Sequence, residues 1–98
     1  MEELGMKVEH NEKEKKFSLR VAGSEGSVRY QKLSDRVWDF YFTFMPSMYD
    51  KEGVKERIIS YALNFAKANN IKIKASCISI QNFLLKNRDF KEVLYFPY

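Results

Sequence analysis

Apolar and polar residues alternate through the first third of the chain, and this period of two predicts β-strands. The segments with this pattern are residues 6–10, 17–21 and 27–33. The charged run 11–16 is typical of a surface turn between the first two segments, and the glycines of 22–26 indicate a hairpin turn between the next two. We therefore expect the fold to begin as an antiparallel meander.

A longer apolar segment follows the meander. Residues 37–45 are nearly all apolar and rich in aromatic and β-branched side chains, which predicts a central strand covered on both faces. Pro46 ends this strand, because proline has no N–H to donate to a sheet. From Gly53 to about Asn69 the apolar residues change to a helical period, and Asp50 is the expected N-cap of that helix.

The remaining residues predict one more strand and one more helix. Residues 71–78 alternate again, Ser79 is placed to cap a helix that ends near Asn87, and residues 90–98 are typical of a short strand or an ordered tail. A helix between two strands makes the fourth and fifth strands parallel neighbours. The predicted fold class is α+β: a mixed, mostly antiparallel sheet of about five to six strands with two helices, in the order β-β-β-β-α-β-α.

Positive charge is concentrated in the second half of the chain. Residues 1–50 carry eight Lys and Arg against nine Asp and Glu, whereas residues 51–98 carry nine against four. This asymmetry suits an anionic partner, either a nucleotide cofactor or a nucleic acid, although a solvated basic surface gives the same pattern. A nucleic acid is not the expected partner, because no recognised binding motif accompanies the basic residues of the last third. Those residues are Lys72, Lys74, Lys86, Arg88 and Lys91.

The chain has one cysteine, Cys77, and one histidine, His10. A single cysteine excludes an intramolecular disulfide and a cysteine-based metal site, and it is typical of a reducing compartment. The N-terminal residues lack the basic and apolar blocks of a signal peptide, and no apolar run approaches the roughly 18 residues that a membrane helix needs. We therefore expect a cytoplasmic protein with no membrane partner.

The segment between the fourth strand and the first helix, residues 44–55, has two interpretations. The first turn of a helix exposes backbone N–H groups without intrahelical partners, and the helix dipole adds positive charge there, so the segment suits a bound phosphate. The same residues also suit an ordinary strand-to-helix turn.

With these elements in this order, the chain resembles the short, stand-alone members of the GNAT superfamily of acetyl-CoA-dependent N-acetyltransferases. The matching features cover nearly the whole chain and are Val8 with His10, Phe17, Val28-Arg-Tyr30, Thr43-Phe-Met-Pro46, Gly53, Ala62 with Ala66, Cys77, and Phe83-Leu-Leu-Lys-Asn87. The resemblance implies a single GNAT-like domain over residues 1–98 with acetyl-CoA as its cofactor. It also implies transfer of the acetyl group to an amine that the sequence does not identify.

The resemblance places the CoA pyrophosphate on backbone amides after the fourth strand, where the superfamily motif reads Arg or Gln, two residues, Gly, one residue, then Gly or Ala. The residues that it implies for CoA binding are Phe44, Met45, Lys51, Glu52, Gly53, Val54 and Lys55. Of the motif only Gly53 is kept, because Asp50 replaces the Arg or Gln and Lys55 replaces the small residue. The alternative is therefore a non-catalytic interaction or regulatory module that has lost CoA binding and contacts a protein partner.

Direct acetyl transfer needs a base for the amine, a donor that polarises the thioester carbonyl, and an acid for the leaving thiolate. Cys77, which the resemblance places near the bound thioester, can take up the acetyl group or donate a proton, unless it is a small buried hydrophobe. His10 has a suitable pKa, but its place on the first strand near a charged turn favours a solvated surface histidine. Tyr41 or the backbone N–H of Met45 can polarise the carbonyl.

Overall fold

A computed structural model describes residues 7–21, 23–46 and 53–95. The strands are β1 (Val8–Asn11), β2 (Lys16–Val21), β3 (Ser24–Lys32), β4 (Val37–Phe44) and β5 (Lys72–Ala75). The helices are α1 (Val54–Ala68), α2 (Ile78–Lys86) and the 3-10 helix η2 (Arg88–Val93). The predicted α+β class and the order of elements up to α2 are thus confirmed.

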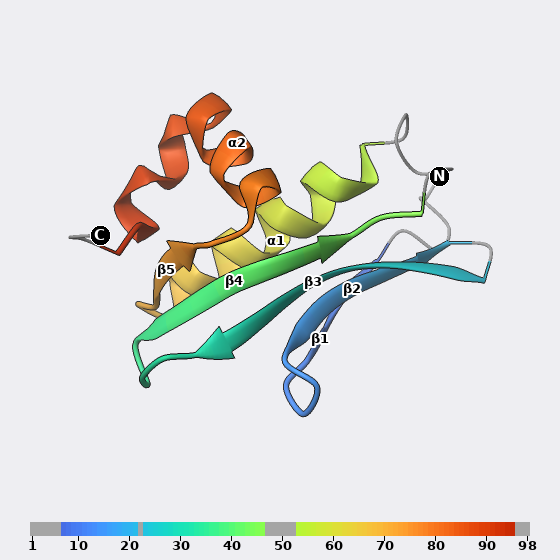
Figure 1. The fold of residues 1–98 in the computed structure, drawn as a ribbon, viewed down its shortest axis with the longest axis horizontal. Coiled ribbons are helices and arrows are strands. Elements are labelled where there is room, and N and C mark those ends of the chain that lie inside the picture. The colour runs from blue at the N-terminus through green and yellow to red at the C-terminus, as the bar shows by residue number, and fades with distance from the viewer. Residues whose placement is uncertain (1–6, 22, 47–52, 96–98) are drawn as a thin grey trace.

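The five strands form one sheet in the order β1-β2-β3-β4-β5. The first three pairs of neighbours are antiparallel, as expected for strands joined by short turns, and β4 pairs with β5 in parallel because α1 connects them. Figure 1 shows α1 along one face of the sheet, and α2 and η2 beyond the β5 edge. No helix within the described residues has the length and apolar composition to cross a bilayer.

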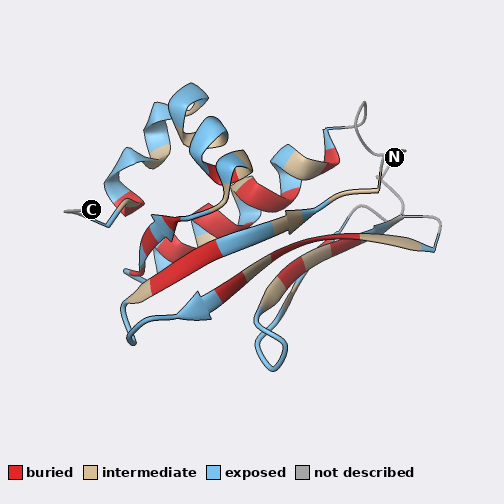
Figure 2. Ribbon diagram, in the orientation of Figure 1, coloured by how far each residue is buried: buried red, intermediate tan, exposed pale blue. Residues whose placement is uncertain are grey.

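The core lies between the sheet and α1. Phe17 and Leu19 on β2, with Val28 and Tyr30 on β3, alternate with more exposed residues and are at most 1% exposed. The apolar stripe of α1 covers them, and its members Val54, Ile58, Ile59, Ala62, Leu63 and Ala66 are all buried. Figure 2 shows this buried layer running along α1 and the facing strands. Each fully buried aliphatic or aromatic side chain of this kind contributes about 2 kcal/mol to folding.

The second half of β4 departs from the prediction of a strand covered on both faces. Tyr41, Phe42 and Phe44 are 47%, 44% and 50% exposed. The reason is that α1 covers one face of the sheet, and a β-bulge in the β3–β4 ladder, with Tyr41 as the extra residue, changes which side chains face it. The apolar sequence predicted burial along the whole strand, but within β4 only Trp38 to Phe40 are buried.

The turn between β2 and β3 is shorter than predicted. The strands extend to Val21 and from Ser24, so that Gly26 lies inside β3. Gly23, with φ of 84°, takes the conformation that favours glycine in a turn. Gly26 serves a different purpose, because a Cβ there would lie 2.8 Å from the sulfur of Met45.

Three helix and strand ends also differ from the prediction. The N-cap of α1 is Gly53 rather than Asp50, which lies outside the described residues. The N-cap of α2 is Cys77 rather than Ser79. Because the helix begins earlier than predicted, β5 ends earlier too, at Ala75. The short strand or ordered tail predicted for residues 90–98 begins within η2, and among the described residues of that segment only Leu94 makes a β-bridge, parallel to Ile73.

Candidate functional site

The parallel strands β4 and β5 separate at one end of the sheet. Pairing of β4 with β5 stops at Phe40 and Ala75, and the backbone N–H of Cys77 donates to the Phe40 carbonyl at 3.1 Å. Beyond this point β4 continues to Phe44, paired with β3 alone among the described residues. We call this region, residues 41–45 together with 76–79, the strand-end site.

Cys77 lies in the strand-end site between the end of β5 and the start of α2. Its Sγ lies 3.2 Å from Oγ1 of Thr43 on β4, in a hydrogen bond that either group can donate. The sulfur is half-buried and packs against the edge of the core. This contact joins β4 and α2 across the point where β4 and β5 separate.

The surroundings of Cys77 favour the thiolate. Burial raises the pKa, but the Thr43 hydroxyl and the backbone N–H groups of Ser79 and Ile80 oppose it, and the pKa lies below its ordinary value of 9.0. These N–H groups belong to the first turn of α2, and the positive end of the helix dipole that they form favours a negative charge on the sulfur. Cys77 is the N-cap residue, but its side chain makes no cap hydrogen bond. A thiol with a lowered pKa is both a better nucleophile near neutral pH and a better proton donor to a thiolate.

The first turn of α1 carries backbone N–H groups that have no intrahelical partner. Gly53 is the N-cap residue, with φ of 70°, a left-handed conformation that other residues rarely adopt. No side chain among the described residues caps the helix. Val54 is 1% exposed and Lys55 is half-buried. Of the residues implied for CoA binding, Lys51 and Glu52 lie outside the described residues.

Phe44 and Met45 follow the bulge at the end of β4, and their side chains have different surroundings. Phe44 is 50% exposed. Met45 is half-buried and packs against the core, close enough to Gly26 that an added Cβ would touch its sulfur. The structure therefore brings Thr43, Phe44, Met45 and Cys77 to one end of the sheet, with the Met45 side chain turned toward the core.

His10 lies elsewhere. It is on β1, and three strands separate it from β5. Its Nε2 is 2.6 Å from the Tyr30 hydroxyl, and its ring stacks on Phe17 at 4.2 Å and meets the edge of Phe65 at 4.6 Å. His10 is therefore a half-buried member of an aromatic cluster, neither a solvated surface histidine nor a neighbour of Cys77.

The pKa shifts of His10 and Tyr30 favour the neutral form of both side chains. Burial lowers the pKa of His10, with Lys32 acting in the same direction and Glu12 opposing them. Burial and Glu12 also raise the pKa of Tyr30 to about 12. A protonated phenol beside a neutral imidazole favours donation from the Tyr30 O–H to Nε2 of His10.

Sequence reasoning did not single out Thr43 as a partner of Cys77. The parallel register pairs Phe40 with Ala75, so a regular ladder would bring Phe42 level with Cys77. The extra residue Tyr41 shifts β4 by one position and places Thr43 there instead. A bulge of this kind has no clear sequence signal, since aromatic residues on both sides of Tyr41 fit a regular strand.

Comparison with known proteins relates the sequence and the fold of this chain to those of other proteins. A family model described as GCN5-related N-acetyl-transferase matches residues 16–93. The proteins named NATD1 of Gallus gallus and Mus musculus are each 26% identical over 84 residues, which is 84% of this chain and 76% of theirs. A solution NMR structure of a GCN5-like protein from Staphylococcus aureus has the same fold, with a TM-score of 0.75 at 18% identity over 98% of this chain and 94% of that one.

Proposed function

Because the chain belongs to the GCN5-related N-acetyl-transferase family, we propose that it binds acetyl-CoA at the strand-end site and transfers the acetyl group to an amine. The observation that carries this proposal is the contact between Cys77 Sγ and Thr43 Oγ1, at the point where β4 outlasts β5. It places the one thiol of the chain, with a lowered pKa, beside backbone that β5 leaves unpaired.

Three described features fit the parts of acetyl-CoA. Backbone of β4 beyond Phe40 has no partner in β5, so it suits an extended chain with amide groups such as pantetheine. The first turn of α1 has N–H groups without a side-chain cap among the described residues, which suits a pyrophosphate. The half-buried Lys55 adds positive charge at that turn.

Acetyl-CoA, when bound, supplies an activated thioester. Cys77 has two ways to act on it. As a thiol it gives the proton on Sγ to the departing CoA sulfur while the amine nitrogen bonds to the carbonyl carbon, the C–S bond breaks, and the amine loses a proton to solvent. As a thiolate, Sγ would bond to the carbonyl carbon while the C–S bond to CoA breaks and CoA leaves as a thiolate. The amine nitrogen would then bond to the same carbon while the bond to Sγ breaks, which restores the Cys77 thiolate as the amine loses a proton to solvent. In both cases the Thr43 hydroxyl positions the sulfur.

The two roles of Cys77 are separated by mass spectrometry of the whole protein. The protein is mixed with acetyl-CoA without an acceptor, and then with spermidine as a probe amine while CoA release is followed with a thiol reagent. An acetylated protein that loses its acetyl group to spermidine supports the nucleophile. CoA release without acetylated protein supports the proton donor. No CoA release above spontaneous hydrolysis with spermidine, lysine or a lysine peptide would overturn the transferase proposal.

A second candidate function is favoured by Lys55. A half-buried lysine stands where the superfamily motif has Gly or Ala, and its side chain obstructs the close backbone approach that such a residue allows. On this view the chain is a non-catalytic interaction module with the same fold.

Calorimetry with acetyl-CoA separates the two functions. The native chain is compared with one variant that combines Asp50→Arg, Lys51→Gly and Lys55→Ala. Binding by the native chain, equal to or tighter than that of the variant, supports the transferase. Binding by the variant alone supports the module. Asp50→Arg adds two positive charges and the two lysine substitutions remove two, so the variant keeps the net charge of the native chain and a change in binding reflects the loop itself.

A further inference from the structure

A cavity of about 490 Å³ lies at the outer edge of β5, on the side of the strand away from β4. Two backbone carbonyls of β5 mark this side. That of Ile73 accepts a hydrogen bond from the N–H of Tyr95 at 2.9 Å, and that of Ala75 accepts one from the Gln81 side chain at 2.8 Å. We call this space the edge cavity. Its lining residues are Ala75, Gln81, Leu84, Leu85, Arg88, Lys91 and Leu94.

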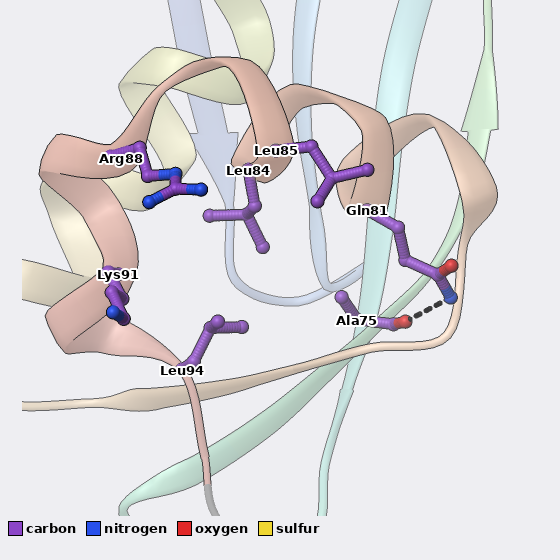
Figure 3. Close-up of a pocket in the computed structure, with 7 residues that line it drawn as sticks. All are labelled: Ala75, Gln81, Leu84, Leu85, Arg88, Lys91 and Leu94. Carbon is purple, nitrogen blue, oxygen red and sulfur yellow. Dashed lines mark hydrogen bonds between the residues drawn. The ribbon is translucent and has the colours of Figure 1, made fainter.

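The edge cavity has an apolar side and a cationic side. Figure 3 shows Leu84 and Leu85 reaching in from α2, Leu94 from the segment after η2, and Ala75 from β5. Arg88 and Lys91 both come from η2, with the guanidinium of Arg88 turned toward Leu84. Leu85 is 72% exposed, so this apolar surface is open to a ligand rather than sealed in the core.

The two cations of the edge cavity, Arg88 and Lys91, have no anionic partner in the part of the chain that the structure describes. Neither Arg88 nor Lys91 forms a salt bridge within the described residues. The acids of η2 face the other way: Glu92 pairs with Lys67 of α1 at 2.9 Å, and Asp89 lies near enough to Lys67 to raise its pKa further. η2 thus directs its acids toward α1 and its bases toward the cavity.

We propose that the edge cavity binds a small monomeric carboxylate with an apolar body, of the size and kind of a medium-chain fatty acid. The carboxylate is held by Arg88 and Lys91, since a guanidinium fork matches its two oxygens. The chain lies along Leu84, Leu85 and Leu94. The volume falls within the range of about 300 to 1,000 Å³ that is usual for small-molecule sites.

Other ligand classes fit the edge cavity less well. No aromatic side chain of the described residues lines it, so they offer a nucleotide base nothing to stack on. No carboxylate of the described residues lines it either, so they offer a cationic ligand no counter-charge. The edge cavity is also separate from the strand-end site, which lies on the β4 side of β5, and this inference does not depend on the proposed acetyl transfer.

The test is a titration of the isotope-labelled chain with decanoate below its micelle concentration, followed by NMR. We expect saturable shifts at Ala75, Gln81, Arg88 and Leu94, and weaker binding of decanol and of decyltrimethylammonium. Combining Arg88→Gln with Lys91→Gln is expected to weaken decanoate binding about tenfold. Combining Lys74→Gln with Lys86→Gln removes the same charge from exposed positions outside the cavity and is expected to leave affinity within about twofold.

The apolar side is tested by Leu85→Asn, which lies at an exposed position and is expected to weaken decanoate several-fold without unfolding the chain. Equal affinity for decanoate and decyltrimethylammonium would overturn the proposal, as would equal losses in the two double variants. Binding to phosphatidylglycerol vesicles without binding to monomeric decanoate would also overturn it, because the cavity would then be part of a membrane-contacting surface.

Discussion

His10 and Cys77 are each the only residue of their kind in the chain, yet the fold gives them opposite surroundings. His10 packs against the rings of Phe17 on β2 and Phe65 on α1, and its one described polar contact is the 2.6 Å contact with Tyr30. Cys77 sits where two strands separate and a helix begins, with the Thr43 hydroxyl and the α2 amides around its sulfur.

This difference shows that the surroundings of a reactive side chain, more than its type, decide whether it contributes to stability or to chemistry. A group inside a packed cluster has its polarity matched by the fold, so its loss costs stability. A group at a strand end with a lowered pKa stabilises less and remains available for chemistry. We therefore expect substitutions at His10 to change unfolding and substitutions at Cys77 to change acetyl transfer.

The largest expected effect is the loss of transfer in Cys77→Ala. Removing a proton donor or nucleophile usually costs about a hundredfold in rate or more, and we expect kcat with spermidine or the best amine found to fall by about that factor. The free energy of unfolding should change by less than about 1 kcal/mol, because Cys77 is only half-buried. Full activity in Cys77→Ala would remove the thiol from the mechanism.

The next effect is the loss of stability in His10→Ala, which we expect to be about 2 kcal/mol in urea unfolding. The variant removes the stack on Phe17 and leaves the hydroxyl of Tyr30 without its described partner. Tyr30→Phe is the matched control and should cost about 1 kcal/mol, because it removes the hydrogen bond and keeps the ring. Reduced transfer per folded molecule in His10→Ala would contradict the comparison.

A smaller effect is expected from Thr43→Val, which keeps the shape of the side chain and removes its hydroxyl. Without this hydrogen bond the pKa of Cys77 should rise toward its ordinary value. Alkylation by iodoacetamide near pH 8 should slow by less than about tenfold, since one hydrogen bond contributes about 1 kcal/mol. An unchanged dependence of alkylation on pH would mean that the α2 amides and the Ser79 side chain set the thiolate population without Thr43.

The smallest effect is a dependence of stability on pH from His10. The pKa of His10 is lowered in the folded chain, so the unfolded chain binds more protons between the folded pKa and about 6.5. The contribution of His10 to the free energy of unfolding should therefore be complete above pH 6.5, and it should decline as the pH falls below that value. His10→Gln should flatten this decline, and an equal slope in both proteins would show that other groups cause it.

Much of the fold follows from the sequence pattern alone. The alternation of Phe17 and Leu19 and the helical stripe of α1 predicted elements that lie within a few residues of those observed. The parallel pairing of β4 and β5 followed from the helix between them. These features are local, or depend only on the order of the elements.

The features that position the site depend on contacts between distant segments, and the sequence pattern did not indicate them. The bulge at Tyr41 decides that Thr43 reaches Cys77, and the cap at Cys77 decides where α2 begins. The same limit applies to His10, since only the register of β1 on β2 places it beside Phe17. The catalytic role assigned to Cys77, and the CoA-binding roles assigned to Phe44, Met45 and residues 51–55, remain predictions.

The most direct test of the account is an NMR titration of the isotope-labelled chain with acetyl-CoA. We predict saturable shifts at the amides of Thr43, Met45, Val54 and Cys77, with none at His10 and none at the edge cavity. The absence of any shift at millimolar acetyl-CoA would contradict the account, as would shifts that appear at His10 and its aromatic neighbours while those of Thr43 and Cys77 stay unchanged.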